Sequence, residues 1–342
     1  MKIKFAVIGT SKITKMFLAA AKQDERFHLQ AVYSRNMQTA QIFAKEHQAD
    51  MFFDDLSDLA NCLDIDAVYV ASPNSYHAQQ AIQMMEAGKH VLCEKPIAVN
   101  TTEFDKMIVT AKKNNVCLME AMLSSFVPNF LVIKNSINKV GHLRKFIASF
   151  CQYSSRYPAY LKGEKPNTFN LAFANGSLVD IGIYPLYAAI SLFGKPDKIQ
   201  SQCTKLSSGV DGCGDVLLSY DQLSDKRLNN GKSSQLQAVI SHSKVSSGEN
   251  VGELQGELGR IVWQHSSEFN QVKLVMNSGE EQLLSTKQNN NKMVYECQHF
   301  LDLITDKCIE SPVNTWQLSL YVLNVLEQVR NQQSIVYPND NV

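Results

Sequence analysis

The sequence predicts a two-domain α/β protein, with a doubly wound parallel sheet followed by a domain built on a large, mostly antiparallel open sheet. At 342 residues the chain exceeds the roughly 250–300 residues at which single hydrophobic cores stop growing. Short apolar runs alternate with amphipathic stretches through residues 1–120, whereas strand-like runs follow one another after about residue 122. We therefore expect one domain at residues 1–122 and a second at residues 123–342.

Composition and charge exclude several classes of partner. Hydrophobic residues make up 44% of the chain and charged residues 19%, as in ordinary globular proteins. The 33 basic and 33 acidic residues cancel, whereas nucleic-acid and membrane-surface proteins usually carry a basic excess. No apolar run reaches the roughly 18 residues of a membrane span, and the first run, Phe5–Ile8, is too short for a secretion signal. We expect neither a nucleic-acid partner nor membrane association.

The cysteines and histidines indicate a cytoplasmic protein without a metal centre. The eight cysteines are scattered, form no C-x-x-C motif, and fall partly within apolar runs, which is typical of reduced core thiols. The eight histidines are dispersed as well, whereas a metal site needs clustered ligands.

Six short strands and five helices are expected in the first domain. The strands are Ile3–Ile8, His28–Tyr33, Met51–Phe53, Ala67–Ala71, His90–Cys93 and Val116–Met119. The helices are Ile13–Lys22, Met37–His47, Leu56–Cys62, Tyr76–Ala87 and Thr102–Lys113. This alternation predicts βαβ units, whose right-handed crossovers place helices on both faces of a parallel sheet.

Polar residues follow four of these strands, at the edge where such sheets bind ligands. They are the turn after Ile8, Ser34-Arg35, Ser72-Pro73-Asn74 and Glu94-Lys95-Pro96. A purely structural sheet would not need polar residues at all four positions.

The stretch Gly9-Thr10-Ser11-Lys12-Ile13-Thr14 resembles a phosphate-binding turn in which two of the three usual small residues are replaced. In the pattern G-x-G-x-x-G/A the glycines allow a tight turn, a close approach of backbone to pyrophosphate, and packing of helix on strand. Only Gly9 is kept, while Ser11 and Thr14 occupy the other two positions. The helix start still favours an anion. An ordinary strand-to-helix turn remains an alternative interpretation.

The end of the second strand favours NADP over NAD. Cofactor ribose is usually held by Asp or Glu about 20 residues after the first glycine. Here the sequence is Tyr33-Ser34-Arg35-Asn36, which contains a hydroxyl and a guanidinium but no acid. The flat, charged guanidinium suits a 2′-phosphate. The alternative is that Arg35 is a solvated residue that caps the following helix.

Four motifs together resemble one enzyme family. They are "ASPNSYH" at residues 71–77, "EAGKHVLCEKP" at 86–96, "LMEAMLSSFVPNF" at 118–130 and "DIGIYP" at 180–185. In this order they are similar to the glucose-fructose oxidoreductase / inositol dehydrogenase / MocA family, over nearly the whole chain. The third motif is similar to the dimeric dihydrodiol dehydrogenase branch.

The resemblance implies a Rossmann domain that binds NAD or NADP, followed by an α/β domain whose open sheet often forms dimer or tetramer contacts. It implies hydride transfer between nicotinamide and a hydroxyl or carbonyl carbon of a small sugar or polyol. Lys95 would lie near the reacting oxygen, Glu94 by the nicotinamide ribose, and Asp180 would be the acid of the D-x-G-x-H pattern. Tyr184 replaces the histidine of that pattern, as in the dihydrodiol dehydrogenase branch. We expect a homodimer or homotetramer.

These residues suit acid/base chemistry. A free phenol has a pKa near 10, and a neighbouring ammonium lowers it. Lys95 and Tyr184 are therefore expected to form the acid/base unit, with Asp180 as the residue that orients them. The cofactor-binding candidates are Gly9, Thr10, Ser11, Lys12, Ile13, Ser34, Arg35, Ser72, Pro73, Asn74, His77, Glu94 and Lys95.

Each assignment has a structural alternative. Lys95 can be a surface lysine, and Tyr184 a packed core aromatic. Asp180 can cap the following helix, and His77 can bind the cofactor or cap the helix after Pro73. Arg156 can reach an anionic group or lie on the surface, which is the commoner fate of arginine.

The second domain reads as a sheet with few helices. Strands are expected at Leu143–Gln152, Lys198–Lys205, Asp215–Tyr220, Leu236–Ser243, Gly252–Leu258, Gly259–Trp263 and Val272–Met276. Helices are expected at Pro128–Asn138, Ser177–Phe193, Met293–Thr305 and Thr315–Asn331, and an exposed hairpin loop at residues 222–234.

We therefore expect an NAD(P)-dependent dehydrogenase or reductase acting on CH–OH groups. The alternative from another class is a non-catalytic NAD(P)-binding regulator, and a third is an interaction protein without a cofactor. The presence of Lys95, Asp180 and Tyr184 together favours the enzyme.

Overall fold

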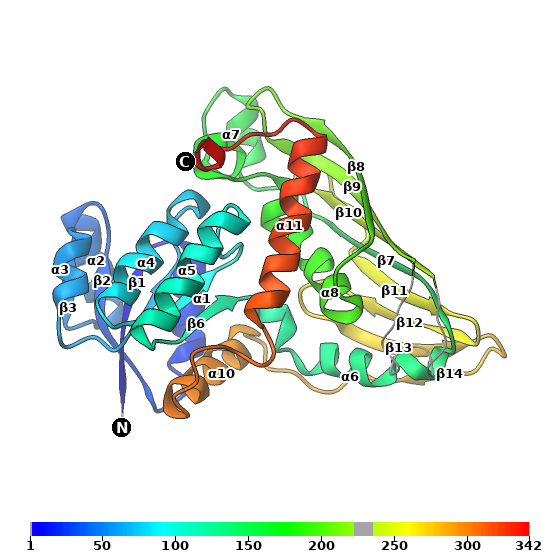
Figure 1. Cartoon of the computed structure of the whole chain (residues 1–342), viewed down its shortest axis with the longest axis horizontal. Coiled ribbons are helices and arrows are strands. Elements are labelled where there is room, and N and C mark those ends of the chain that lie inside the picture. The colour runs from blue at the N-terminus through cyan, green and yellow to red at the C-terminus, as the bar shows by residue number, and fades with distance from the viewer. Residues whose placement is uncertain (1, 222–234, 342) are drawn as a thin grey trace. The chain divides into compact units, whose positions relative to one another are not determined.

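The computed structural model describes residues 2–221 and 235–341, so the expected hairpin loop at 222–234 lies outside the described residues. Contacts divide the chain into two compact units (Figure 1). The first comprises Met1–Leu123 and Asn289–Leu320, and the second comprises Ser124–Gln288 and Tyr321–Val342. The expected boundary at residue 122 lies next to this division, but the contacts also group residues 289–320 with the first unit.

The first unit is built on a six-stranded parallel sheet with the order β3-β2-β1-β4-β5-β6, which confirms the doubly wound α/β fold. Its strands are nearly continuous apolar runs because both faces of a parallel sheet are covered. The strands are β1 (Ile3–Ile8), β2 (Phe27–Tyr33), β3 (Met51–Phe53), β4 (Ala67–Val70), β5 (His90–Glu94) and β6 (Leu118–Ala121).

All five expected helices of this part are present, with small changes at their ends. They are α1 (Lys12–Ala21), α2 (Met37–His47), α3 (Leu56–Asn61), α4 (His77–Glu86) and α5 (Thr101–Asn114). Three of them have an N-cap residue whose side chain accepts a hydrogen bond from a backbone N–H of the first turn. These residues are Asn36 before α2, Asp55 before α3 and Asn100 before α5.

A segment from late in the chain completes the first unit. Helix α10 (Met293–Thr305) places Phe300 against Phe5 of β1, with ring centroids 6.0 Å apart. Trp316, at the start of α11 (Trp316–Gln332), donates its indole N–H to the carbonyl oxygen of Leu118 at 3.0 Å. These contacts bury apolar surface that the first 123 residues leave exposed, which is why residues 289–320 belong to this unit.

The second unit contains an eight-stranded sheet with the order β14-β13-β12-β11-β7-β10-β9-β8. All neighbouring pairs are antiparallel except β7 and β10, which confirms the expected mostly antiparallel sheet. The strands are β7 (Leu143–Cys151), β8 (Lys198–Lys205), β9 (Asp211–Tyr220), β10 (Leu236–Ser243), β11 (Val251–Gly256), β12 (Gly259–Gln264), β13 (Asn270–Met276) and β14 (Glu281–Leu283).

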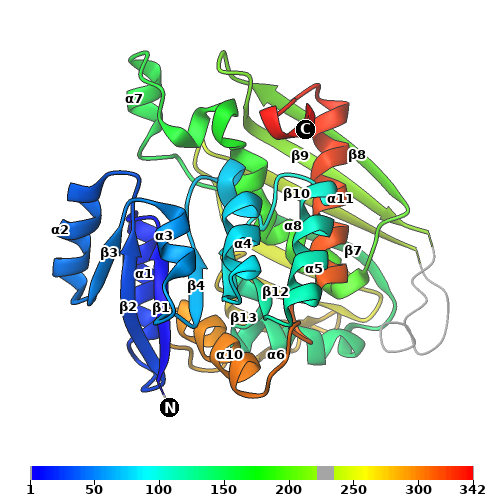
Figure 2. The same ribbon diagram turned by 60° about the vertical axis from the view of Figure 1, so that its left-hand side comes forward.

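The helices of the second unit gather on one face of this sheet. In the described part of this unit they are α6 (Pro128–Ser136), α8 (Ile183–Phe193) and the later part of α11, which runs along β8 in both views (Figures 1 and 2). The short α7 (Tyr157–Leu161) lies beyond the ends of the strands. Gln332 and Gln333 donate to the carbonyl oxygens of Ile199 and Ser201 at 2.9 and 2.7 Å. The sequence did not predict α7 or the three-residue strand β14.

Strand β7 shows how the two faces differ. Phe146, Ala148 and Phe150 are buried beneath helices, whereas Ile147 and Ser149 on the other face are only half-buried. One stretch, Leu171–Phe193, is long and apolar enough to cross a membrane, but 83% of its most apolar window is buried inside the fold. The apolar character of this stretch is therefore explained by its place in the buried core.

Candidate active site

The turn between β1 and α1 requires glycine and presents a free helix start. Gly9 has φ +110°, and a Cβ there would lie 2.5 Å from the carbonyl oxygen of Ala71. Ser11 precedes α1 in an extended conformation, and its side chain makes no capping hydrogen bond. The first backbone N–H groups of this ten-residue helix are therefore available to an anion.

Thr14 occupies the third position of the fingerprint and is completely buried. Its hydroxyl has no hydrogen-bond partner among the described residues. The threonine therefore serves the packing of helix on strand, which is the role of the third small residue of the fingerprint.

The turn after β4 lies directly beside Gly9. The backbone nitrogen of Ser72 would be 3.5 Å from a Cβ on Gly9, so the two turns approach within contact. The hydroxyl of Ser72 is buried and has no partner among residues 2–221 and 235–341. Gly9 leaves space because it has no side chain, and the buried Ser72 hydroxyl needs a partner. Both features fit a dinucleotide whose pyrophosphate approaches the backbone here.

Arg35, which follows β2, lies over the ring of Tyr76. Its guanidinium carbon is 5.8 Å from the ring centroid, a cation–π distance. The neighbouring Ser34 donates its backbone N–H to Phe53, and its hydroxyl accepts a hydrogen bond from the backbone N–H of Asn36. The stacking holds an otherwise exposed guanidinium at the edge where a cofactor ribose would lie.

His77 joins two of the polar turns. Its Nε2 lies 2.8 Å from the carbonyl oxygen of Ser72, and its Nδ1 lies 2.9 Å from that of Pro96. Burial lowers the pKa of His77, while the two carbonyl groups act in the opposite direction. Both of these contacts are to carbonyl oxygens and not to the free N–H groups of α4, so they give no support to the capping alternative.

Glu94 and Lys95 end strand β5. Glu94 is 7% exposed, and its Oε1 accepts a hydrogen bond from the Tyr69 hydroxyl at 2.5 Å. Burial raises the pKa of Glu94, and the charge of Lys95 acts most strongly against that rise. Lys95 itself is half-buried, unlike the freely solvated lysine of the surface alternative.

In the second unit, Asp180 and Tyr184 lie one turn apart. Asp180 is inside a π-helical turn (Leu178–Gly182) that leads into α8, and the cap positions of these two elements are Ser177 and Gly182, so the alternative interpretation of Asp180 as a helix cap is wrong. Residues four apart face the same side of a helix. The Lys244 ammonium donates to the Asp180 Oδ2, and the two side chains are 10% and 29% exposed.

The close packing around Gly182 explains why the D-x-G motif has a glycine at this position. A Cβ on Gly182 would lie 2.9 Å from the ring of His242, so the π-turn packs directly on strand β10. The Nδ1 of His242 lies 3.0 Å from the Ser177 hydroxyl, and Asp211 accepts the Leu178 N–H at 2.7 Å. This buried network fixes the turn that carries Asp180.

Burial disfavours the charged forms of His242 and Asp211 in this network. It lowers the pKa of His242 to about 3 and raises the pKa of Asp211 to about 6. The Asp211 Oδ2 lies 3.7 Å from His242 Nδ1, which is too far to outweigh the loss of hydration, so the histidine is neutral near pH 7.

Tyr184 is half-buried, and its ring centroid lies 5.7 Å from that of Phe150. It is therefore not enclosed as a core aromatic would be. Arg156 is exposed at the start of α7, as the surface alternative expects.

Each unit thus brings one group of candidates together. The carboxyl edge of the first sheet carries the turns of Gly9, Ser34, Ser72 and Glu94, and the π-turn of the second unit carries Asp180 and Tyr184. Sequence reasoning missed Lys244, because this lysine lies 64 residues from Asp180 and stands in no motif. Among the described residues there is no group of metal-ligating side chains.

Comparison with known proteins decides the family. A family model described as an oxidoreductase family with an NAD-binding Rossmann fold matches residues 3–122, and the model of its C-terminal domain matches residues 136–262. The chain belongs to the Gfo/Idh/MocA oxidoreductase family. The expected resemblance and the assignment as an oxidoreductase with a nucleotide-binding Rossmann domain are both confirmed.

Curated relatives of this Gfo/Idh/MocA member extend over its full length. The chain is 44% identical over 338 residues to the scyllo-inositol 2-dehydrogenase (NADP(+)) IolU of Bacillus subtilis (strain 168), covering 99% of each protein. It is 26% identical over 351 residues to the trans-1,2-dihydrobenzene-1,2-diol dehydrogenase of Xenopus tropicalis, covering 99% of this chain and 100% of the relative.

Solved structures share the fold. The aldose-aldose oxidoreductase from Caulobacter crescentus, complexed with glycerol, superposes with a TM-score of 0.81 at 21% identity, covering 98% of both chains. The 3-ketoreductase KijD10 from Actinomadura kijaniata, in complex with NADP and TDP-benzene, has a TM-score of 0.79 at 22% identity, covering 97% of this chain and 98% of the other. At this identity the likeness concerns the fold alone.

Proposed function

We propose that the protein is an NADP-preferring dehydrogenase or reductase that acts on a hydroxyl or carbonyl carbon of a small sugar-, polyol- or dihydrodiol-like substrate. The observation that carries the proposal is the Glu94-Lys95 turn, which lies at the carboxyl edge of a nucleotide-binding sheet. The named activity of the Bacillus relative, an NADP-dependent inositol dehydrogenase, supports this class of substrate.

The residues of the first unit have distinct roles toward the cofactor. Backbone N–H groups of Thr10, Ser11, Lys12 and Ile13 would hold the pyrophosphate at the start of α1. Ser34 and Arg35 would bind the ribose 2′-phosphate, since Arg35 is charged and held over Tyr76. Ser72, Pro73 and Asn74 would line the path to the nicotinamide ribose, beside Glu94. The bound nicotinamide supplies the hydride chemistry itself.

His77 has a different role in this proposal. Its two ring nitrogens are directed at backbone carbonyl oxygens of Ser72 and Pro96. We assign to it the positioning of the turns that carry Ser72 and Lys95, and not a direct bond to the cofactor.

Proton transfer is assigned to Lys95 and Tyr184. These residues belong to different units, and their meeting over the substrate is part of the proposal. The Lys95 ammonium would stabilise negative charge on the reacting oxygen, while the phenol exchanges its proton with that oxygen. Asp180, paired with Lys244, would remain ionised and orient the other groups rather than accept a proton.

The test is turnover of NADPH and NADP⁺ with a panel of inositols, sugars, dihydrodiols and dicarbonyl compounds. Lys95→Met and Tyr184→Phe are expected to reduce kcat by about 10²- to 10⁴-fold while the proteins stay folded. Lys113→Met, an exposed lysine on α5, is the matched control and is expected to keep full activity. Normal turnover in a folded Lys95→Met enzyme would refute the catalytic assignment.

Two other results would redirect the assignment. A protein that binds NADPH in calorimetry but turns over no member of the panel would be a regulator. A protein whose Trp263 and Trp316 fluorescence and heat of mixing are unaffected by NADPH would be an interaction protein without a cofactor.

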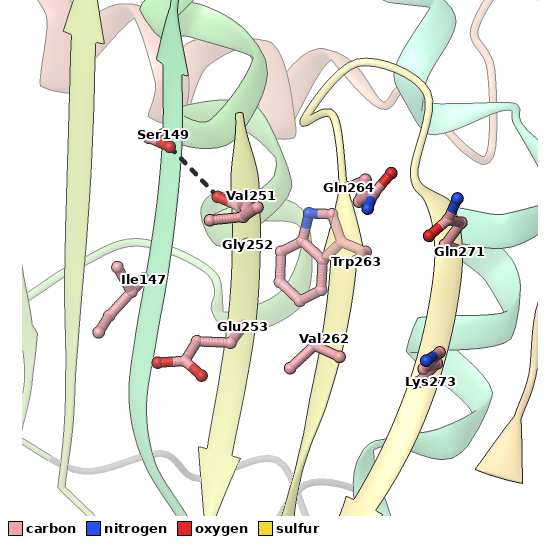
Figure 3. Close-up of a pocket in the computed structure, with 10 residues that line it drawn as sticks. All are labelled: Ile147, Ser149, Val251, Gly252, Glu253, Val262, Trp263, Gln264, Gln271 and Lys273. Carbon is pink, nitrogen blue, oxygen red and sulfur yellow. Dashed lines mark hydrogen bonds between the residues drawn. The ribbon is translucent and has the colours of Figure 1, made fainter. Parts of the chain in front are cut away.

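We also propose that the enzyme is a homodimer formed through the open face of the second sheet. This face holds a cavity of about 370 Å³ over β7, β11, β12 and β13 (Figure 3). Ile147, Val251 and Val262 line it with apolar groups, and the charged Glu253 and Lys273 line it as well, with Glu253 drawn between Ile147 and Val262 in Figure 3. An apolar hollow with charged neighbours of both signs suits the same surface of a second copy. The eight free thiols are consistent with a cytoplasmic location, which we propose as well.

A further inference from the structure

Glu296, on helix α10, is a buried acid without a protein partner. Its side chain is 0% exposed, and neither carboxyl oxygen has a hydrogen-bond partner among residues 2–221 and 235–341. Phe300, one turn further along α10, contacts Phe5 of β1, so this side of the helix faces the sheet of the first unit. An apolar residue of similar size would cost less here, because burial of an unpaired polar group is unfavourable.

A second buried carboxyl, that of Glu94, lies close enough to Glu296 for the two groups to interact electrostatically. Tyr69 of β4 is stacked on Phe17 of α1 with centroids 3.7 Å apart, and its hydroxyl donates to the Oε1 of Glu94. The other oxygen of Glu94 accepts the backbone N–H of Lys95 at 3.2 Å. Glu94 therefore has two donors and a neighbouring cation, while Glu296 has none of these in the described part of the chain.

Two carboxyl groups in so dry a layer do not both ionise. Burial and then the charge of Glu94 raise the pKa of Glu296 well above its usual range. Burial also raises the pKa of Glu94, but Lys95 and the Tyr69 hydroxyl favour its charged form. The negative charge of the pair is consequently most stable on Glu94, and the proton on Glu296.

We propose that Glu296 is a positioning residue of the nicotinamide site, which stays protonated behind Glu94 and so keeps the single negative charge of the pair next to Lys95. This rests on the proposed function, because it takes Glu94 and Lys95 to face the cofactor. The other titratable groups that interact with the cluster include Tyr69 of β4, Cys93 of β5, Cys297 of α10 and Asp24 after α1. Tyr69 remains a phenol, since burial raises its pKa well above the usual range.

The decisive experiment is the pH dependence of unfolding in the full-length protein and in Glu296→Gln. A glutamate that is neutral when folded and ionised when unfolded makes the folded state less stable as pH rises. Above about pH 5.5, and for as long as Glu296 stays protonated in the folded state, the folding equilibrium constant of the variant should therefore gain about tenfold per pH unit relative to wild type. Urea denaturation at several pH values measures this ratio.

Glu120→Gln is the matched control. Glu120 is an equally buried glutamate of the same unit, but it accepts hydrogen bonds from the Ile97 N–H at 3.0 Å and the Ser319 hydroxyl at 2.6 Å. Its replacement should lower stability, because it removes the acceptor of these two hydrogen bonds. Glu296→Met, uncharged and similar in length, must reproduce the gain seen with Glu296→Gln. A ratio independent of pH in both Glu296 variants would overturn the proposal.

Nucleotide binding tests the link to the site. The pH at which the unfolding ratio stops growing marks the ionisation of Glu296 in the folded wild type, and above that pH the added negative charge should favour the cationic nicotinamide of NADP⁺ over NADPH. The ratio of the two Kd values should then change with pH in wild type and stay flat in Glu296→Gln. Equal pH dependence in both proteins would overturn the positioning role. Failure to bind either nucleotide would overturn the proposed function, while the unfolding curves would still decide whether Glu296 is protonated.

Discussion

The ammonium group of Lys244 donates a hydrogen bond to the carboxylate of Asp180, although 64 residues separate them in the chain. Lys244 follows the end of β10, and Asp180 lies in the π-turn that packs on that strand through Gly182 and His242. The second unit therefore supplies a cation to the acid of the D-x-G motif by itself. The pair is largely buried, so its partners are less screened than those of a surface ion pair.

Replacement of Lys244 by methionine is expected to reduce kcat about tenfold at neutral pH and to move the acid limb of the kcat/KM profile to higher pH. Without the cation the Asp180 carboxylate is harder to keep ionised. Lys244→Arg should restore the profile. The control is Lys198→Met, which breaks the exposed Lys198–Asp221 pair of the same unit, 3.2 Å long. An unchanged profile in Lys244→Met would show that the pair does not orient Asp180.

Replacement of Arg35 by serine should weaken the binding of NADPH more than the binding of NADH. Loss of a charge-assisted contact to the 2′-phosphate is expected to raise the KM for NADPH about 10- to 100-fold and to leave that for NADH nearly unchanged. Steady-state kinetics with both cofactors measures the change. Arg144→Ala, which removes an exposed arginine paired with Glu257, should alter neither value. A wild-type enzyme that prefers NADH would refute the inference.

His242 should make the protein sensitive to acid. Its pKa is lowered to about 3 in the folded state from an ordinary value of 6.5, so the unfolded chain binds the proton more readily. The stability due to the neutral ring is present above about pH 6.5 and is lost as pH falls toward about 3.

Replacement of His242 by glutamine removes this sensitivity. Relative to wild type, the variant should gain about 1.4 kcal/mol per pH unit on acidification below about pH 6. Thermal unfolding between about pH 4 and about pH 7 measures it. The effect of Asp211 on the pH dependence of stability has the opposite sign, since its pKa is raised to about 6. Asp211 is present in both proteins, so its effect is common to both curves. Parallel curves would mean that the ring is already protonated when folded.

Val251→Lys should convert the proposed dimer to a monomer. Val251 is 46% exposed beside the cavity of Figure 3, and a lysine there would place two ammonium groups in a self-complementary interface. Light scattering at micromolar concentration reports the mass. Val109→Lys, which changes a valine 64% exposed on α5, is the control and should leave the mass unchanged. A wild-type monomer would refute the dimer itself.

Local patterns account for much of what the sequence predicted. The apolar runs and amphipathic stretches of residues 1–120 correspond closely to the strands and helices of the first unit, because burial of neighbours two, three or four residues apart sets these patterns. Polar residues after strand ends likewise predicted the turns of Gly9, Ser72 and Lys95. These signals need no knowledge of which distant segments meet.

The sequence by itself therefore determined the two kinds of sheet, the family and the polar turns that carry the candidate residues. Only the tertiary structure decided that residues 289–320 pack on the first sheet, that β7 and β10 pair in parallel, and that Lys244 meets Asp180. It also buried Glu296 within electrostatic reach of Tyr69 and Glu94. Such contacts join segments far apart in the chain, and their energy comes from burial and charge in the folded molecule, which leave no periodic trace in the sequence.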